Sequence, residues 1–155
     1  TRFKVVLSFK VDEKPTAEKP AESKQEASLA GRHILLVEDN ALNMKIEEFV
    51  LERAGAVLTK AVNGKEAVEL FAASEQGAFD AILMDIMMPV MDGLTAARTI
   101  RALERSDAQT VPIVALSANA FAEDEAESQQ AGINDYLSKP LNAQQLIKTL
   151  QKYLH

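Results

Sequence analysis

Short apolar runs alternate with segments of helical period along most of this chain. The runs have the length of β-strands and lie at residues 33–37, 56–61, 80–86, 111–116 and 133–138. The other segments repeat apolar positions every three or four residues and cover residues 41–54, 64–75, 93–105, 120–131 and 142–153. The two periods distinguish strands from helices. Five strand–helix units of this size predict a doubly wound α/β fold, with a parallel sheet covered by helices on both faces.

Residues that favour helix ends agree with these boundaries. Asn63, followed three residues later by Glu66, is typical of a helix start, and Asn142 precedes the last helical segment. Gly55 and Gly132 follow helical segments, as glycines that end helices do.

The first thirty-one residues have a different character. Residues 1–11 are rich in β-branched and aromatic residues and read as a strand without a partner strand nearby in the sequence. Residues 12–31 are mostly Pro, charged and small residues, and Leu29 is the only large apolar residue between Asp12 and Ala30. Such a segment cannot bury enough apolar surface to offset its ordering entropy. We therefore expect an orphan strand at 1–11, a flexible linker at 12–31 and the folded domain at 32–155.

Composition excludes several classes of function. The chain of 155 residues has no cysteine, which rules out disulfides, thiolate metal sites and thiol catalysis. Its net charge of −6 argues against a nucleic-acid partner. No apolar stretch approaches the roughly 20 residues that cross a bilayer, so we expect no direct membrane contact.

Polar residues that can carry chemistry follow the predicted strands. In an open α/β sheet, sites form beyond the carboxyl ends of the strands. The residues at these ends are three carboxylates, a hydroxyl and an amine: Glu38, Asp39, Asp85, Ser117 and Lys139. Three carboxylates in one place repel one another unless a cation neutralises them, and an oxygen-only ligand set suits Mg²⁺. A carboxylate beside a metal and a lysine predicts phosphoryl transfer, with the carboxylate as nucleophile.

The local sequences around these residues resemble the receiver domain of two-component signalling. The likeness spans residues 32–154 and rests on four motifs: LLVEDN at 35–40, ILMDIMMPVMDG at 82–93, VALSANA at 114–120 and DYLSKP at 135–140. It implies a five-stranded sheet in the flavodoxin-like order 2-1-3-4-5. It also implies that Asp85 accepts the phosphoryl group and that Mg²⁺ is bound by Glu38, Asp39, Asp85 and the backbone carbonyl of Met87.

The same resemblance assigns roles to the later strand ends. Ser117 is expected to hydrogen-bond the phosphoryl group, Lys139 to pair with a phosphoryl oxygen, and Tyr136 to be the aromatic switch residue. It also implies a cis peptide bond before Pro140. The partner would be a histidine kinase or a histidine-phosphotransfer domain that donates the phosphoryl group, and the domain would catalyse its own phosphorylation and dephosphorylation.

Residues 1–11 are similar to the last strand of a histidine-kinase ATP-binding domain. With the Asp-Asn-x-x-Asn pattern at 39–43, this favours a hybrid sensor histidine kinase as the parent, membrane-anchored with its receiver in the cytoplasm. Two alternatives stay open: a stand-alone response regulator, and a receiver-like module that binds partners without phosphotransfer. Weak homodimer formation stays open as well. A haloacid-dehalogenase-like phosphatase is excluded because Met87 stands where its second aspartate would be.

The first helical segment has more apolar residues than one face can bury. Ile46, Val50 and Ala54 are expected to face the sheet, with Leu51 at the margin of this stripe. Leu42 and Phe49 would then face solvent beside the acidic residues, where they could anchor a helix of the phosphodonor.

Overall fold

The fold is a single parallel sheet between two layers of helices. The computed structural model describes residues 29–118 and 125–154. The five strands pair in the order β2-β1-β3-β4-β5, the order that the family resemblance implies. All four strand pairs are parallel. The strands are β1 (His33–Val37), β2 (Val57–Ala61), β3 (Ala81–Asp85), β4 (Ile113–Ser117) and β5 (Asp135–Ser138).

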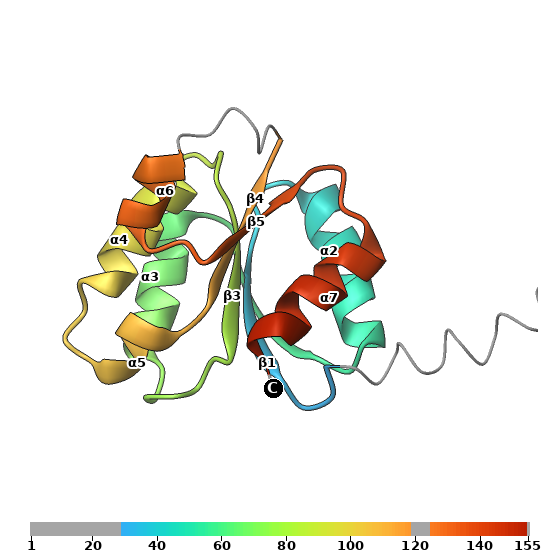
Figure 1. Cartoon of the computed structure of the whole chain (residues 1–155), viewed down its shortest axis with the longest axis horizontal. Helices are drawn as coiled ribbons and strands as arrows, with labels where there is room; N and C mark the ends of the chain where they lie inside the picture. The colour runs from blue at the N-terminus through green and yellow to red at the C-terminus, as the bar shows by residue number, and fades with distance from the viewer. Residues whose placement is uncertain (1–28, 119–124, 155) are drawn as a thin grey trace, which may run out of the picture.

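The helices cover both faces of the sheet, which Figure 1 shows edge-on. Those of the described segments are α2 (Ala41–Arg53), α3 (Gly64–Ala73), α4 (Gly93–Arg101), α5 (Ser106–Thr110), α6 (Glu125–Ala131) and α7 (Ala143–Tyr153). On one face lie α2 and α7, and on the other lie α3 to α6. Within the described ranges, no helix has both the length and the apolar character to cross a membrane.

Two apolar clusters form the core, one on each face of the sheet. In β1, Leu35 and Val37 belong to the cluster under α3 and α4, whereas Ile34 and Leu36 belong to the cluster under α2 and α7. Successive side chains of a strand point to opposite faces. The part of a strand that is buried on both faces must therefore be apolar, as β1 is from Ile34 to Val37.

The predicted helix ends are confirmed. The side chain of Asn63 accepts a hydrogen bond from the backbone N–H of Glu66, and Asn142 caps α7 through Gln145. Gly55 and Gly132 adopt positive φ angles after α2 and α6.

One helix is shorter than predicted. The helix expected at 93–105 ends at Arg101, and a separate short helix, α5, follows. Between the two helices lies Arg105, whose guanidinium donates hydrogen bonds to the carbonyl oxygens of Phe71, in the last turn of α3, and of Ser74 and Glu75 just after it. These contacts bind residues far apart in the sequence, so local periodicity could not reveal them. The helix expected at 120–131 is described only from Glu125 onward.

The folded domain begins before residue 32. Leu29 is 1 % exposed and belongs to the cluster under α2 and α7, and its N–H donates to the carbonyl of Ala54 at 2.8 Å. Residues 29–31, which precede the predicted boundary at residue 32, therefore pack with the domain; an isolated leucine in a polar segment gives no periodic signal. The strand expected at 1–11 and most of the linker lie outside the described residues.

The buried face of α2 is also rotated from the predicted one. Ile46, expected against the sheet, is 49 % exposed, while Glu47, Leu51 and Ala54 are buried. The prediction gave interior positions to apolar residues alone and could not include a glutamate. Leu42 and Phe49 are exposed, as the sequence predicts, at 69 % and 60 %.

Candidate functional site

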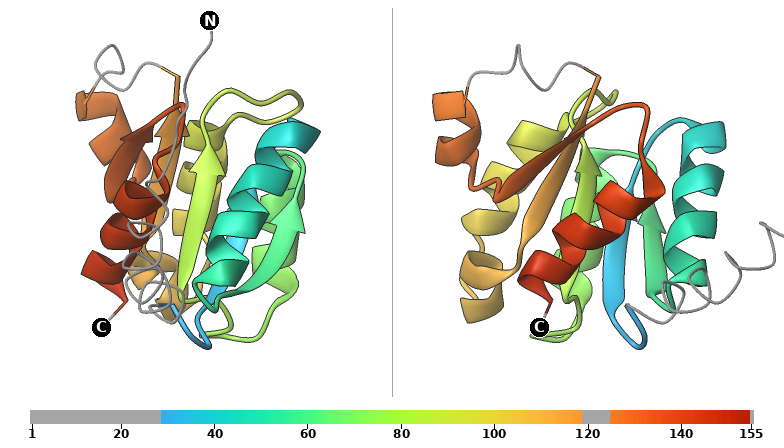
Figure 2. Two further views of the ribbon diagram at one scale, coloured as in Figure 1. Left: turned by 90° about the vertical axis from the view of Figure 1, so that its right-hand side faces the viewer. Right: turned by 45° about the vertical axis from the view of Figure 1, so that its right-hand side comes forward.

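The carboxylates gather where the strand order reverses. The chain runs from β1 outward to β2 and returns across β1 to β3, so β1 and β3 are neighbours with helices that leave toward opposite faces. Ligands of open α/β sheets bind at this switch point. Glu38 and Asp39 follow β1 directly, and Asp85 ends β3. Figure 2 shows the strands pointing to the same end of the sheet, the end at which α2 begins.

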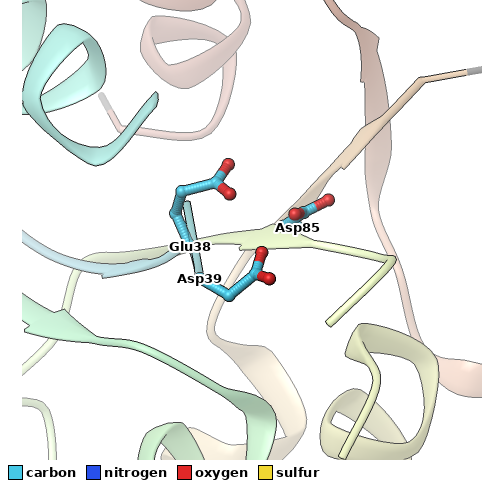
Figure 3. A group of neighbouring side chains, drawn as sticks. All are labelled: Glu38, Asp39 and Asp85. Carbon is cyan, nitrogen blue, oxygen red and sulfur yellow. The ribbon is translucent and has the colours of Figure 1, made fainter. Parts of the chain in front are cut away.

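Three carboxyl groups share a small space there (Figure 3). One oxygen each of Glu38, Asp39 and Asp85 lies within 4.8 Å of the others. Glu38 and Asp85 are buried, whereas Asp39 is exposed, so the group is open to solvent on one side. Oxygen ligands at this spacing, with one solvent-facing edge, fit a hard divalent cation that keeps part of its water shell.

Lys139 joins two of these carboxylates. Its Nζ lies 2.7 Å from Glu38 Oε2 and 3.2 Å from Asp85 Oδ2. The backbone places it there, because the N–H of Lys139 donates to the carbonyl of Ser117 at 2.8 Å, just beyond the paired ends of β4 and β5. The peptide bond between Lys139 and Pro140 is cis.

The surroundings shift the pKa values of the two buried acids, Glu38 and Asp85, in opposite directions. Burial raises the pKa of Asp85 to about 6, with the charge of Glu38 as the next cause, and Lys139 opposes both. Burial also acts to raise the pKa of Glu38, but hydrogen bonds from Lys139 and the N–H of Asn40 outweigh it and hold that pKa below its usual value. Glu38 is therefore the carboxylate whose charged form pairs with Lys139. Ionising Asp85 costs free energy, because this carboxyl group is buried beside the charge of Glu38.

The loop after Asp85 is held tightly against β3. The N–H of Gly93 donates to the carbonyl of Ile86 at 2.9 Å, and a Cβ atom at Gly93 would lie 2.3 Å from the carbonyl oxygen of Asp85. Only glycine fits this approach. The N–H of Met87 turns back to Asp85 Oδ1 at 3.3 Å, which fixes the carboxylate relative to the loop.

The other predicted site residues occupy different positions. Ser117 is buried at the end of β4, one residue beyond the partner of Asp85 in the sheet, Leu116. Tyr136 is half-buried on β5 and packs against the cluster under α3 and α4. Leu42 and Phe49 lie along the exposed side of α2, outside the acidic group.

Sequence reasoning missed Glu47. This residue of α2 is 2 % exposed and lines the same pocket as Lys139. Burial, then the charge of Glu38, raises its pKa to about 8. Its helical spacing from Leu51 and Ala54 would have placed it on the buried side of α2. A charged residue is not expected on a buried side, so the prediction left it out.

A pocket of about 390 Å³ lies beside this group, between α2 and the loop that leads into α7. It is lined by Asn43, Ile46, Glu47, Lys139, Pro140 and Leu141. Ile46 is also one of the exposed apolar residues of α2. These residues therefore adjoin the pocket that contains Lys139.

Comparisons with known proteins agree with this arrangement. The model of the response regulator receiver domain matches residues 34–151. Hybrid signal transduction histidine kinase B of Dictyostelium discoideum is 42 % identical over 132 residues, and sensor protein GacS of Pseudomonas syringae pv. syringae is 40 % identical over 121 residues. These matches cover 79 % and 77 % of this chain but only 7 % and 13 % of the two relatives.

Solved structures give the same result. A sensor histidine kinase receiver domain from Pseudomonas aeruginosa PAO1, crystallised with a magnesium ion coordinated in its active site cleft, is 43 % identical with a TM-score of 0.72. That match covers 81 % of this chain and 98 % of the other. The receiver domain of Saccharomyces cerevisiae Ssk1, crystallised with the histidine phosphotransfer protein Ypd1, is 31 % identical with a TM-score of 0.69, over 81 % and 90 % of the two chains. This chain therefore belongs to the response regulator receiver domains of two-component signalling and is homologous to the receivers of hybrid histidine kinases.

Proposed function

We propose that this domain accepts a phosphoryl group on Asp85 from a phosphohistidine. The observation that carries the proposal is the arrangement of Glu38, Asp39 and Asp85 within 4.8 Å, with Lys139 bridging two of them. An oxygen of Asp85 attacks phosphorus, the phosphorus–nitrogen bond of the donor breaks, and its electron pair returns to the imidazole. The products are an acyl phosphate on Asp85 and an unphosphorylated histidine.

The acidic group fits Mg²⁺ by the chemistry of its ligands. Glu38, Asp39 and Asp85, together with the backbone carbonyl of Met87, would hold the ion. When bound, Mg²⁺ offsets the repulsion of the carboxylates and the charge of the transferring phosphoryl oxygens. Lys139 supplies a second positive charge, and Ser117 offers a hydroxyl to the phosphoryl group from the neighbouring strand. Tyr136, on β5 beside Ser117's strand, is the proposed switch residue that alters a partner surface.

The donor is proposed to dock on the exposed side of α2. Leu42 and Phe49, with Ile46 between them, form an apolar strip next to the pocket that contains Lys139. A helix that carries the donor histidine could cover this strip while its histidine reaches Asp85. The parent is proposed to be a membrane-anchored hybrid sensor histidine kinase with this domain in the cytoplasm, with residues 1–11 as the end of its ATP-binding domain and 12–31 as a linker.

Phosphorylation by a small donor tests the core of the proposal. The protein is incubated with Mg²⁺ and acetyl phosphate, and intact mass spectrometry is expected to record the gain of one phosphoryl group. Asp85→Asn should abolish the gain because the amide is not a competent nucleophile. Asp92→Asn is the matched control: Asp92 is an exposed cap of α4 in the same loop, and asparagine caps equally well. A wild-type protein that gains no phosphoryl group would instead favour a module that only binds partners.

A further inference from the structure

The start of α3 contacts the β3–α4 loop, residues 86–92. The N–H of Gly64, the first residue of α3, donates to the carbonyl oxygen of Met91 at 3.0 Å. A Cβ atom at Gly64 would lie 2.5 Å from this oxygen and 3.0 Å from the carbonyl oxygen of Asp92. Both oxygens belong to the backbone, so any larger residue at position 64 requires the loop or the helix to move.

The β3–α4 loop contains a strained turn next to this contact. Val90 has a φ of +70°, and the N–H of Met91 donates across it to the carbonyl of Pro89 at 2.7 Å. A strained conformation persists only where the surrounding structure fixes it. The side chain of Val90 is 77 % exposed, so its own packing fixes little. The hydrogen bond that Gly64 makes to the next residue, Met91, therefore restrains the turn from the side of α3.

The other end of the β3–α4 loop is restrained where β3 ends. The N–H of Gly93, just after the loop, donates to the carbonyl of Ile86 at 2.9 Å and closes the base of the loop. The N–H of Met87 donates to Asp85 Oδ1 at 3.3 Å. Met87 therefore lies in a loop that is fixed at its base by the end of β3 and at its outer part by α3.

We propose that Gly64 is a positioning residue that holds the β3–α4 loop in the position from which the backbone carbonyl of Met87 binds Mg²⁺. This inference rests on the proposed metal site. A backbone ligand has no rotatable side chain, so its position depends entirely on the loop that carries it. Supports behind a metal ligand affect affinity because they hold the ligand in place before the ion binds. Gly64 acts on the ion only through the loop.

Substitution of Gly64 gives the direct test. Gly64→Ala displaces the loop through the added Cβ atom, and it does not weaken the helix itself because alanine is the better helix former. NMR titration of the full chain gives the Mg²⁺ dissociation constant of the folded protein, a readout that does not depend on phosphotransfer. Gly77→Ala is the matched control. Gly77 has a φ of +81°, so alanine is strained there, but among the described residues nothing beyond its chain neighbours lies within 4 Å of the added Cβ.

We expect Gly64→Ala to weaken Mg²⁺ binding by about tenfold, as the loss of a support behind a metal ligand does. Gly77→Ala should lower the melting temperature and still bind Mg²⁺ within about twofold of the wild type, because distant sites act independently. Wild-type affinity in folded Gly64→Ala would overturn the inference, and so would equal weakening in both variants, which would indicate general destabilisation. A wild type that bound no Mg²⁺ would refute the proposed metal site as well.

Amide hydrogen exchange of the unsubstituted protein tests the same coupling without relying on the folding of a variant. Coupling is reciprocal: if opening the hydrogen bond of Gly64 weakens Mg²⁺ binding, saturating Mg²⁺ must slow that opening by the same factor, about tenfold. The N–H of Gly31 is the reference, because it donates to the carbonyl of Gly55 at the same 3.0 Å at the opposite end of the sheet. Its exchange should slow by less than about twofold, since local openings differ between regions. Equal slowing at both amides would indicate global stabilisation and would overturn the inference.

Discussion

Crowding destabilises the ionised form of Asp85 in the folded protein. Burial and the charge of Glu38 raise its pKa, so its ionised form costs free energy at neutral pH. We expect Asp85→Asn to melt about 4 °C or more above the wild type in chelator at pH 7.5, which corresponds to about 1 kcal/mol. Differential scanning calorimetry measures this difference. Glu104→Gln, which removes a carboxylate from an exposed position, should leave the melting temperature within about 1 °C.

The difference in melting temperature between the wild type and Asp85→Asn should depend on pH. Asp85 binds its proton near pH 6 when folded but near its ordinary pKa of 3.8 when unfolded. Between these values the folded state holds more protons, so the free energy of unfolding falls as pH rises. The wild type should therefore approach the Asp85→Asn variant as pH falls from 7.5 to 4.5. A gap that stays constant or widens on acidification would contradict the raised pKa.

Val90 is held in an unfavourable backbone conformation next to the site. Its φ is +70°, it is 77 % exposed, and the N–H of Met91 donates across it to the carbonyl of Pro89 at 2.7 Å. A β-branched residue in a turn of this kind is strained, and packing does not compensate at an exposed position. Val90→Gly should therefore stabilise the protein by about 1 kcal/mol in urea unfolding. Val62→Gly, at an exposed loop valine outside the positive-φ region, should be neutral or destabilising; the same gain there would refute strain as the cause.

At the scale of elements, α2 has a buried side and an exposed apolar side. Its inner side carries Glu47 and Leu51, and its outer side carries Leu42 and Phe49. We expect the double variant Leu42→Ala/Phe49→Ala to slow transfer from the cognate histidine protein by about tenfold, because interface anchors are worth about 1–2 kcal/mol. Phosphorylation by acetyl phosphate, which needs no docking, should be unchanged in the mass assay.

The control for docking is a pair of exposed apolar residues elsewhere. Val57→Ala/Val62→Ala removes similar apolar surface near β2 and should not affect transfer. Equal losses with both donors in the α2 double variant would reject the docking role.

The short segment before β1 belongs to the folded domain. Leu29 fills the core under α2 and α7, and the N–H of Gly31 donates to the carbonyl of Gly55 at 3.0 Å. The free energy of unfolding of a chain that begins at Arg32 should therefore be about 2–4 kcal/mol lower than that of a chain that begins at Ser28. This is the usual cost of losing a buried leucine. Chemical denaturation compares the two. Equal stability would place the domain boundary at residue 32, as the sequence predicts.

For the whole molecule, metal binding should be coupled to folding. A ligand that binds only the native state stabilises it by mass action, by about 2.7 kcal/mol at a concentration 100 times the dissociation constant. We expect Mg²⁺ to raise the melting temperature of the wild type and to narrow its gap to Asp85→Asn, which lacks one carboxylate ligand. An equal rise in both proteins would show that Asp85 does not contribute to the site.

The sequence by itself determined the order of strands and helices and most of the acidic site. Local periodicity distinguishes strands from helices, and strand ends in an open parallel sheet must meet along one edge. That topological rule places Glu38, Asp39, Asp85 and Lys139 along one edge, and the strand order, which the family resemblance implies, brings them close together. Caps such as Asn63 were readable because they act within one turn of their own helix.

Tertiary structure decided the features that depend on distant contacts. Glu47 is buried on the inner side of α2 beside the pocket that contains Lys139, which the helical pattern of α2 cannot reveal. Leu29 packs in one apolar cluster with Ala54 and donates its N–H to the carbonyl of Ala54. The guanidinium of Arg105 donates to the carbonyl of Phe71 in the last turn of α3. In each case the partner is distant in the sequence, and an interaction between distant residues leaves no periodic signal in either segment.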